Sequence, residues 1–475
     1  MNSNNTPSWG ELLSGRNGLL SIALAGGVAL HAINIYVTTT ILPSVVRDIG
    51  GLEYYAWNTT LFMVASIIGA PLSKSVLSRF GPRTAYIIAL IIFCIGTLIC
   101  SSAKDMLWML TGRFAQGFGG GILFALSYAL IRIVFNERLW PRAMAIVSGM
   151  WGIATLCGPA VGGIFAHSDS WRFAFIALFP VAAVLAIIVL TQLPSHEKSS
   201  IQSGQVALGK ILLLGVSVLI ISVASLSKEL IVNIVGVVAG FAIATLIARF
   251  DHKSKIKLMP TGAYNIRMPL GAIYACMSLL VIGITTEIFV PYFLQTIHGH
   301  SPLIAGYATA LMAAGWTVGS LFSSGRSPHT AQKFVRLGPV LVVLALLVLA
   351  IIIPPQHLFG SVASLTLICI VLTAVGIGIG ATWPHLLTQV LKNAPAGQED
   401  LASTSITTVQ LYATAIGSAL AGIVANLAGF SDPGGLAGAQ NSAMWLFAIF
   451  AIAPVLATFV ARRASIQQGG STPQR

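Results

Sequence analysis

Residues 113–163 decide the fold, and they read RFAQGFGGGILFALSYALIRIVFNERLWPRAMAIVSGMWGIATLCGPAVGG. Two apolar runs flank a short basic bend here, and each run is long enough to cross a bilayer, which takes about 20 helical residues. Arg113 lies inside the first run, and glycines cluster at 117–121 and 158–163. Glycines let helices approach closely, while a charged side chain at membrane depth needs a partner or a water-filled cavity. The stretch therefore predicts two membrane helices beside a solute pathway.

The composition of the whole chain is that of a membrane protein. Of 475 residues, 56% are hydrophobic and 8% are charged, whereas soluble proteins carry about 25% charged residues. The net charge of +13 does not indicate nucleic-acid binding, because most of the 26 Lys and Arg lie in alternate loops, the positive-inside pattern. The five cysteines have no paired spacing, so we expect neither a disulfide framework nor a metal site.

The apolar runs predict an all-α polytopic protein with fourteen spans, grouped as six, two and six. We expect cytoplasmic tails at 1–17 and 464–475, six-helix bundles at 18–193 and 267–463, and a linker at 194–266 that carries two inserted helices. With both termini inside, the basic residues favour the cytoplasmic loops, which supports an even number of spans. The expected spans are Gly18–Val46, Ala56–Leu77, Thr84–Ser102, Met106–Val134, Ala143–Ala166, Phe173–Leu193, Leu208–Leu226, Leu230–Ala248, Met268–Ile297, Leu303–Ser323, Leu337–Ile353, Leu358–Val390, Leu401–Phe430 and Ala443–Val460.

A repeat relates the two expected bundles. Glycines recur at a separation of 259 residues in the fourth and fifth spans of each bundle. Bundles related in this way rock about a central site near the middle of the membrane, so the repeat predicts alternating access. The glycine pairs are Gly117–Gly376, Gly121–Gly380, Gly158–Gly417 and Gly163–Gly422.

Three motifs carry a family resemblance that extends from about Gly18 to Arg463. They are Arg113-x-x-Gln116-Gly117 in the fourth span, Gly158-Pro159-x-x-Gly162-Gly163 in the fifth, and the segment 292–306 between the ninth and tenth. They resemble motifs of the major facilitator superfamily, and in particular of its fourteen-helix drug:proton antiporter branch. In that family the fourth-helix arginine is associated with proton coupling, and the fifth-helix motif is associated with exporters.

The resemblance implies a monomeric inner-membrane transporter that needs no cofactor and exports small lipophilic or drug-like compounds, in exchange for protons. Two departures remove acids that the family usually carries. Ser78 stands where the loop between helices 2 and 3 usually has an aspartate, and Asn34 stands where the first helix often has one. These departures keep open a second hypothesis, a transporter of one specific metabolite or organic anion.

Three ionisable residues are candidates for proton coupling: Glu287, Arg113 and His31. At 1.5 Å of rise per residue, Glu287 lies roughly 15 Å and Arg113 roughly 10 Å from the outer ends of their spans, so both are expected to face one cavity. Glu287 would take a proton from outside and release it inward; a static ion pair is the alternative role. The alternative role of Arg113 is to anchor backbone carbonyls of neighbouring helices. The alternative role of His31 is that of a hydrogen-bonded packing residue.

Aromatic and amide side chains are candidates for lining the cavity, because they suit a lipophilic or planar solute held by stacking and a few hydrogen bonds. The alternative for each is interface or core packing. The substrate candidates are Asn34, Trp57, Gln116, Trp151, Tyr292, Gln295, Trp316, Trp383, Gln410 and Tyr412. The residues expected to control the conformational change are Arg79, Gly81, Arg83, Gly158, Pro159, Gly162 and Gly163.

An enzyme is not expected. A membrane enzyme needs clustered acids, a metal constellation or a nucleophile–base set, and the sequence has no His-x-x-x-His motif and no Walker-type phosphate loop. A transporter-like sensor without flux remains a further alternative.

Overall fold

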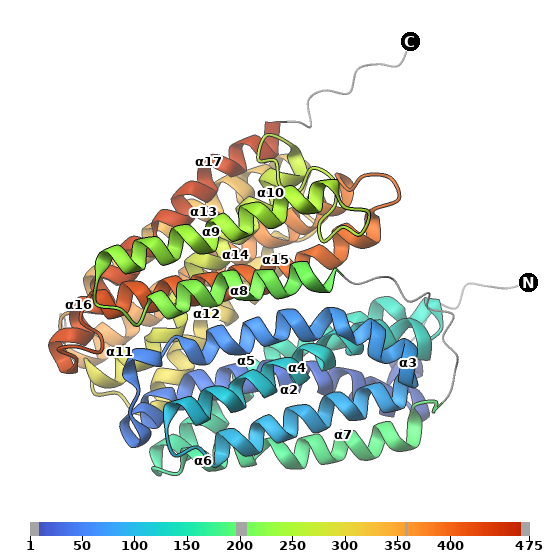
Figure 1. Cartoon of the computed structure of the whole chain (residues 1–475), viewed down its shortest axis with the longest axis horizontal. Helices are drawn as coiled ribbons and strands as arrows, with labels where there is room; N and C mark the ends of the chain where they lie inside the picture. Colours follow the sequence, from blue (N-terminus) through green and yellow to red (C-terminus); the bar gives the residue numbers. More distant parts are fainter. Residues whose placement is uncertain (1–8, 196–206, 357–359, 467–475) are drawn as a thin grey trace, which may run out of the picture. The chain divides into compact units, whose positions relative to one another are not determined.

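A computed structural model describes residues 9–195, 207–356 and 360–466, and its elements are helices (Figure 1). Contacts divide the chain into two compact units. Unit 1 contains Met1–Gly50 and Leu61–Leu208, and unit 2 contains Gly51–Thr60 and Gly209–Arg475. Residues 1–8 and 467–475 of the expected tails, and residues 196–206 of the expected linker, lie outside the described residues.

Unit 1 is built around the four long helices α2, α3, α4 and α5. Helix α3 is bent at Gly81, where φ is 77° and ψ is 170°, values outside the helical region. The elements are α1 (Trp9–Leu13), α2 (Gly15–Ile49), α3 (Trp57–Ser101), α4 (Met106–Val134), η2 (Glu137–Leu139), α5 (Trp140–His167), α6 (Trp171–Ile176) and α7 (Leu178–Gln192); the first residues of α3 belong to unit 2.

Unit 2 contains the remaining helices, including the two that follow the first bundle in sequence. Its elements are η1 (Leu52–Tyr54), α8 (Leu208–Ala224), α9 (Leu230–Lys253), α10 (Pro269–Ile284), η3 (Thr285–Phe289), α11 (Val290–Thr296), α12 (Pro302–Ser323), α13 (Pro328–Ile352), α14 (Ser361–Lys392), α15 (Glu399–Leu427), α16 (Gly435–Phe450) and α17 (Ile452–Ile466).

The prediction of fourteen membrane spans was wrong. The described residues contain twelve helices or helix runs that are long and apolar enough to cross a membrane. The expected second and third spans lie in one run, Leu52–Ser101, which contains the bent helix α3. The expected seventh span is the 17-residue helix Leu208–Ala224, which is shorter than the about 20 residues that a bilayer requires.

The two units share a packing scheme. In unit 1, α2 packs against α4, α5 and α7; in unit 2, α10 packs against α14, α15 and α17. In both units, glycines of the fourth helix lie directly against the backbone of the second. A Cβ atom added to Gly117 would overlap the backbone oxygen of Phe62 in α3, and one added to Gly376 would overlap that of Met312 in α12. The glycine repeat thus corresponds to backbone-to-backbone packing of equivalent helices.

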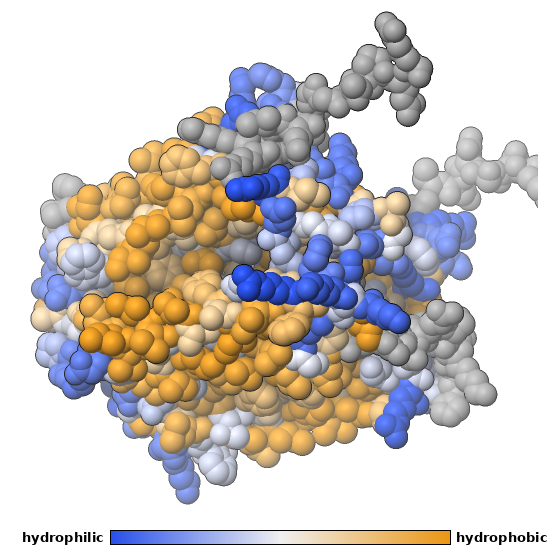
Figure 2. Space-filling model, turned by 45° about the horizontal axis from the view of Figure 1, so that its top comes forward, coloured by the Kyte–Doolittle hydropathy of each residue, from blue (hydrophilic) through white to orange (hydrophobic). Residues whose placement is uncertain are grey.

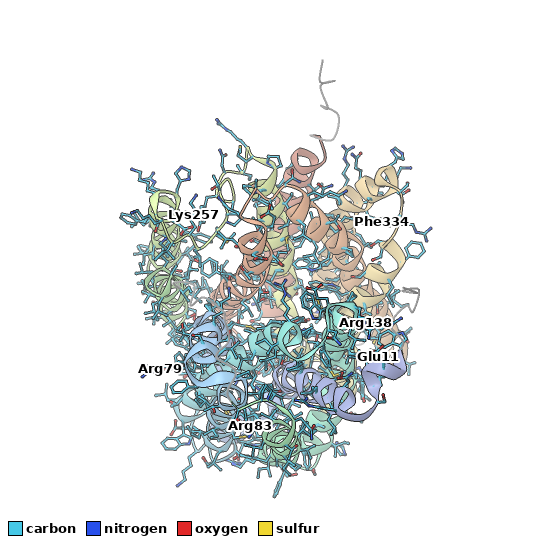
Figure 3. The ribbon with its side chains drawn as sticks, turned by 90° about the vertical axis from the view of Figure 1, so that its right-hand side faces the viewer. Glu11, Arg79, Arg83, Arg138, Lys257 and Phe334 are labelled. Atoms are coloured by element: carbon cyan, nitrogen blue, oxygen red, sulfur yellow. The ribbon has the colours of Figure 1, made fainter. Side chains whose placement is uncertain are left out.

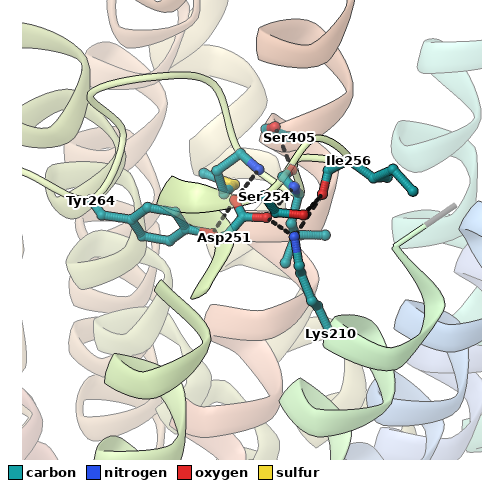
Figure 4. A network of polar contacts seen from close by, with 8 residues as sticks. Lys210, Asp251, Ser254, Ile256, Tyr264 and Ser405 are labelled. Carbon is teal, nitrogen blue, oxygen red and sulfur yellow. Dashed lines mark hydrogen bonds and ion pairs between the residues drawn. The ribbon is translucent and has the colours of Figure 1, made fainter. Parts of the chain in front are cut away.

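The two inserted helices, α8 and α9, are attached to unit 2. The hydroxyl groups of Ser217 in α8 and Tyr412 in α15 lie 2.8 Å apart. At the end of α9, Asp251 is buried and forms an ion pair of 2.6 Å with Lys210 of α8 (Figure 4). Its carboxylate also accepts hydrogen bonds from Leu258 N, Met259 N and the Tyr264 hydroxyl.

This Asp251 network orders the connection from α9 to α10. Lys210 donates a second hydrogen bond of 2.6 Å to Ile256 O, and Ser405 of α15 donates to Leu258 O. Burial, followed by the charge of Asp251, raises the pKa of Tyr264 above its usual value, which keeps its hydroxyl protonated as a donor. The network therefore fastens α8, α9 and the connecting loop to α15.

The outer surface of the helices is apolar. Figure 2 shows hydrophobic residues over much of the visible flank and hydrophilic residues gathered towards the ends of the helices. Large exposed hydrophobic side chains include Leu156, Ile231, Leu321 and Val362. A surface of this kind is stable in lipid and not in water, so the chain is a multi-pass membrane protein.

Candidate functional site

The glycine run at 117–121 brings two neighbouring helices close to α4. A Cβ atom added to Gly120 would lie 2.8 Å from Nδ1 of His31, so glycine here makes room for a side chain of α2. The flanking glycines face the two halves of α3: Gly119 meets Phe93, and Gly121 meets Ser66. The sequence run therefore sets the position of His31.

Arg113 is buried in the core of unit 1, where it is 2% exposed. Its Nη1 donates to Oε1 of Gln116 at 2.8 Å, and its guanidinium carbon lies 4.3 Å from the centroid of the Phe62 ring. A charged hydrogen bond and a cation–π contact both stabilise a cation away from water. Unit 1 thus holds a cation inside the membrane-spanning region.

Gln116 is the centre of a hydrogen-bond network around this cation. Its side-chain oxygen also accepts from Asn34 Nδ2 at 3.4 Å and from Cys100 Sγ at 3.4 Å, and its Nε2 donates to Thr97 Oγ1 at 3.0 Å. Since Gln116 is fully buried and its amide is occupied, its role in this conformation is to orient Arg113 and Asn34.

His31 lies in an aromatic enclosure. Its ring centroid is 5.1 Å from that of Phe62, 5.4 Å from that of Phe124 and 6.4 Å from that of Trp151. Further along the same side of α2, Oδ1 of Asn34 and Oγ1 of Thr38 are buried and have no hydrogen-bond partner among the described residues. Unit 1 thus combines aromatic surface with unused polar atoms, the combination that binds amphipathic solutes.

Glu287 lies where the first long helix of unit 2 changes its winding. Helix α10 ends at Ile284, and Thr285–Phe289 form the 3₁₀ turn η3 before α11 begins. A 3₁₀ segment inside a helix often marks a hinge. The Glu287 side chain is partly exposed, and none of the described residues forms a hydrogen bond or ion pair with its carboxyl group. Its pairing with Arg113 across one cavity stays a prediction, because the two residues belong to different units.

Tyr292 and Gln295 lie on α11, which follows η3 and its Glu287, and their surroundings differ. The Tyr292 ring lies 4.6 Å from that of Phe430 and 5.6 Å from that of Tyr55. Both polar atoms of the Gln295 amide are buried without a hydrogen-bond partner among the described residues. Gln295 therefore has the capacity to bind a polar group of a ligand.

The remaining substrate candidates do not form one group. Trp316 of α12 and Trp383 of α14 are in edge contact at 5.0 Å. Tyr412 turns towards Ser217 of the inserted helix α8. Trp57 contacts Tyr54 at 5.9 Å, and Gln410 is partly buried on α15.

The glycine seam of α5 packs on α2. A Cβ atom on Gly158 would overlap Cβ of Tyr36, and one on Gly162 would lie 3.0 Å from Cβ of Thr40. Pro159 and Gly163 are also buried in this helix. The seam therefore joins two helices of the same unit.

The basic turn in α3 contacts the end of α7. Arg83 Nε donates to Leu193 O at 2.8 Å, which satisfies a carbonyl at the helix C-terminus (Figure 3). Gly81 has a positive φ, and a Cβ atom there would lie 3.1 Å from Ser195 O. Arg79 is exposed, with its guanidinium over the ring of Phe80. The three residues thus differ in role: Arg83 caps, Gly81 bends and Arg79 remains at the surface.

Several residues of these sites were not predicted. Phe62 links Arg113 and His31, Phe124 encloses His31, and Thr97 and Cys100 complete the Gln116 network. Each occupies an ordinary position in an apolar run. The glycine run of α4 was the one sequence pattern that could have indicated Phe62, because Gly117 packs directly on that residue.

A family model described as the Major Facilitator Superfamily matches residues 24–422. The chain belongs to the Major Facilitator Superfamily. This membership confirms the superfamily that the motifs predicted, and the prediction of a transporter rather than an enzyme.

Two relatives indicate how closely the chain matches other transporters. A probable multidrug-efflux transporter of Mycobacterium tuberculosis is 37% identical over 467 residues, which cover 96% of this chain and 97% of that protein. Multidrug resistance protein 3 of Bacillus subtilis is 25% identical over 315 residues, 63% of this chain and 59% of that protein. The similarity to the first relative thus extends over nearly the full length of both chains.

Solved structures show the same fold at low identity. A bacterial homolog to the human lysosomal transporter Spinster, in an inward-facing and unoccupied conformation, has a TM-score of 0.66 at 15% identity, covering 97% of this chain and 99% of its own. A POT family transporter in complex with 5-aminolevulinic acid has the same TM-score and identity, with coverage of 94% and 96%. At this identity the likeness concerns architecture alone.

Proposed function

We propose that the protein is a drug-efflux transporter, which exports small lipophilic or drug-like compounds by alternating access in exchange for protons. The observation that carries the proposal is the 37% identity, over 96% of this chain, to a probable multidrug-efflux transporter. We place the protein in an inner membrane as a monomer, with both termini in the cytoplasm, since this orientation puts most Lys and Arg inside.

Unit 1 supplies the proposed substrate contacts. The aromatic enclosure of His31 suits a flat lipophilic solute, and the unused polar atoms of Asn34 and Thr38 suit one or two hydrogen bonds. Trp151 adds a further aromatic edge, while Gln116 holds Asn34 in place from behind. In unit 2, the proposed substrate contacts are Gln295 and Tyr292.

Glu287 is the proposed proton carrier. A carboxyl group within a membrane helix needs a partner or access to water, and this one has no hydrogen bond or ion pair with the described residues. Its place in the 3₁₀ turn η3 supports a role in which local rewinding moves the carboxyl between two environments. Arg113 then supplies the fixed positive charge, and the seam at Gly158 and Gly162 supports the moving helices.

The test is dye transport in proteoliposomes with an imposed pH gradient, using cationic, neutral and anionic dyes. Wild-type protein is expected to accumulate a dye against its gradient when protons flow the other way. Glu287→Gln is expected to abolish this accumulation while keeping dye–dye exchange, because exchange needs no net proton release. Retained exchange also shows that the variant is folded.

Glu229→Gln is the matched control, since Glu229 is an exposed carboxylate in the same unit. It is expected to behave as wild type. Proton-driven accumulation that persists in Glu287→Gln would remove Glu287 from the mechanism. The absence of gradient-driven transport for every dye class in wild-type protein would contradict drug–proton exchange itself.

A further inference from the structure

The segment Gly51–Thr60 connects α2 to α3 in the chain, yet it packs within unit 2. It consists of η1, Tyr55, Ala56 and the first residues of α3. We call it the strap. Both ends of the strap continue directly into unit 1, because Gly50 and Leu61 belong to that unit. Any motion of unit 1 relative to unit 2 therefore pulls on both ends of the strap.

Tyr55 is the side chain that holds the strap. Tyr55 is 1% exposed, and its ring lies 5.1 Å from that of Phe289, 5.6 Å from that of Tyr292 and 5.4 Å from that of Phe430. Aromatic rings at these separations attract one another beyond the effect of burial alone. The three rings form the pocket that Tyr55 fills.

Helix α15 fixes the backbone of the strap on either side of Tyr55. Ser418 donates to Ala56 O at 3.0 Å and accepts from the Thr60 hydroxyl at 3.0 Å. Asn426 donates to Glu53 O at 3.0 Å. Because Ser418 is fully buried, its two hydrogen bonds to the strap exchange with water only when the strap lifts.

The hydroxyl group of Tyr55 opposes the docked position. It is buried and has no hydrogen-bond partner among the described residues. A buried hydroxyl without a partner is destabilising relative to the same group in water. The ring therefore favours docking, and the hydroxyl favours release.

We propose that the strap is a releasable latch on the outer side of unit 2, in which Tyr55 leaves its aromatic pocket when the transporter opens outward. The latch rests on the proposed function, because alternating access supplies the opening motion. Because the buried hydroxyl offsets part of the favourable free energy of the ring contacts, the docked strap is only slightly more stable than the released one. Trp57, whose Nε1 is likewise buried without a partner among the described residues, adds to this balance.

The test measures how often the strap lifts. Ser418→Cys, in a cysteine-free background, places a thiol beneath the strap, where Ser418 is fully buried. The rate of its reaction with a membrane-impermeant maleimide, added outside right-side-out vesicles, reports lifting. Tyr55→Phe keeps the ring and removes the hydroxyl, and is expected to slow labelling about tenfold. Tyr55→Ala removes the ring and is expected to accelerate labelling about tenfold or more.

Ser442→Cys is the matched control. Ser442 lies on α16 of the same unit, is equally buried and bonds Ala425 O at 3.1 Å rather than the strap. Its labelling is expected to be unchanged by either Tyr55 variant. Should Tyr55→Ala not fold, Tyr55→Phe decides alone.

Labelling of Ser418→Cys that does not change with Tyr55→Phe overturns the latch. Because labelling needs no substrate, the two proposals fail separately. Normal dye efflux with unresponsive labelling removes the latch and keeps the transport function. Responsive labelling without dye efflux keeps the latch and removes the transport function.

Discussion

Unit 1 and unit 2 use the same helix packing but place their charged groups differently. In both, glycines of the fourth helix lie on the backbone of the second, at Gly117 on Phe62 and at Gly376 on Met312. Unit 1 holds a buried cation, Arg113, against the Gln116 amide and the Phe62 ring, whereas unit 2 carries the acid Glu287 where α10 gives way to a 3₁₀ turn. Packing is thus the shared feature of the repeat, and polar chemistry is the variable one.

The contacts of the fifth helix show which positions of the two first helices are equivalent. Gly158 packs on Tyr36 of α2, and Gly417 packs on Thr285 of η3. Matching these contacts makes Glu287 the equivalent of Thr38 in the repeat, and the Thr38 hydroxyl is buried without a hydrogen-bond partner among the described residues. The first helix of unit 1 is continuous through this point, while that of unit 2 is interrupted. Thr38 and Glu287 therefore differ in backbone conformation as well as in charge. This difference agrees with the proposal that Glu287 moves during transport while Thr38 stays in place.

The packing equivalence gives the largest expected effect. Gly117→Leu and Gly376→Leu are each expected to lower the free energy of unfolding by about 3 kcal/mol or more, because the neighbouring atom is a backbone oxygen that cannot move aside. Gly149→Leu is the control, since nothing lies within 4 Å of a Cβ atom there. Thermal unfolding of the purified variants measures the effect. A large loss in one unit alone would break the equivalence.

The inserted helices give unit 2 a second constraint. Asp251→Ala is expected to lower the free energy of unfolding by about 3 kcal/mol, since it leaves a partly buried Lys210 without its carboxylate. Breaking a buried ion pair costs about 3–5 kcal/mol, and we expect the smaller value because the Lys210 side chain is 18% exposed. Lys228→Met is the control, because the pair of Lys228 and Asp432 is 79% and 61% exposed. Thermal unfolding again provides the measurement, and equal losses in the two variants would contradict the role assigned to Asp251.

Local patterns in the sequence predicted the elements that depend on local chemistry. Apolar length located the helices, and glycine spacing located the close contacts of α4, α5 and α14. The span count failed because it depended on the backbone at Gly81 and on the length of α8, neither of which hydropathy reports. The η3 turn has no glycine or proline within Thr285–Phe289, so no residue type in it predicted a break in the helix.

The candidate sites depend on tertiary contacts, which residue type alone does not reveal. Gln116 and Gln295 were predicted together as substrate-binding amides. The structure gives both polar atoms of the Gln116 amide hydrogen-bond partners and leaves both polar atoms of the Gln295 amide without one among the described residues. The strap was missed because a segment between two helices of one unit was not expected to pack in the other.

The two glutamines provide a third test of the comparison. Gln116→Leu is expected to lower the free energy of unfolding by about 2 kcal/mol, because Arg113 loses a charge-assisted hydrogen bond while buried. Gln295→Leu is expected to leave stability unchanged or raise it, since it removes an unsatisfied buried amide. If Gln295 binds substrate, its variant also shows a higher KM for dye transport at normal stability. Equal destabilisation by both substitutions would contradict the difference between the units.

The smallest effect is expected where the two units are alike again, at exposed ion pairs. In unit 1, Arg138 pairs with Glu11 at 3.1 Å, with side chains 57% and 36% exposed (Figure 3). Arg138→Gln is expected to change the free energy of unfolding by less than about 1 kcal/mol, because water screens the pair. The difference from wild type should vanish in about 1 M salt, where the Debye length is about 3 Å. Thermal unfolding at low and high salt measures both, and a loss that persists in high salt would show that Arg138 stabilises unit 1 by packing rather than by charge.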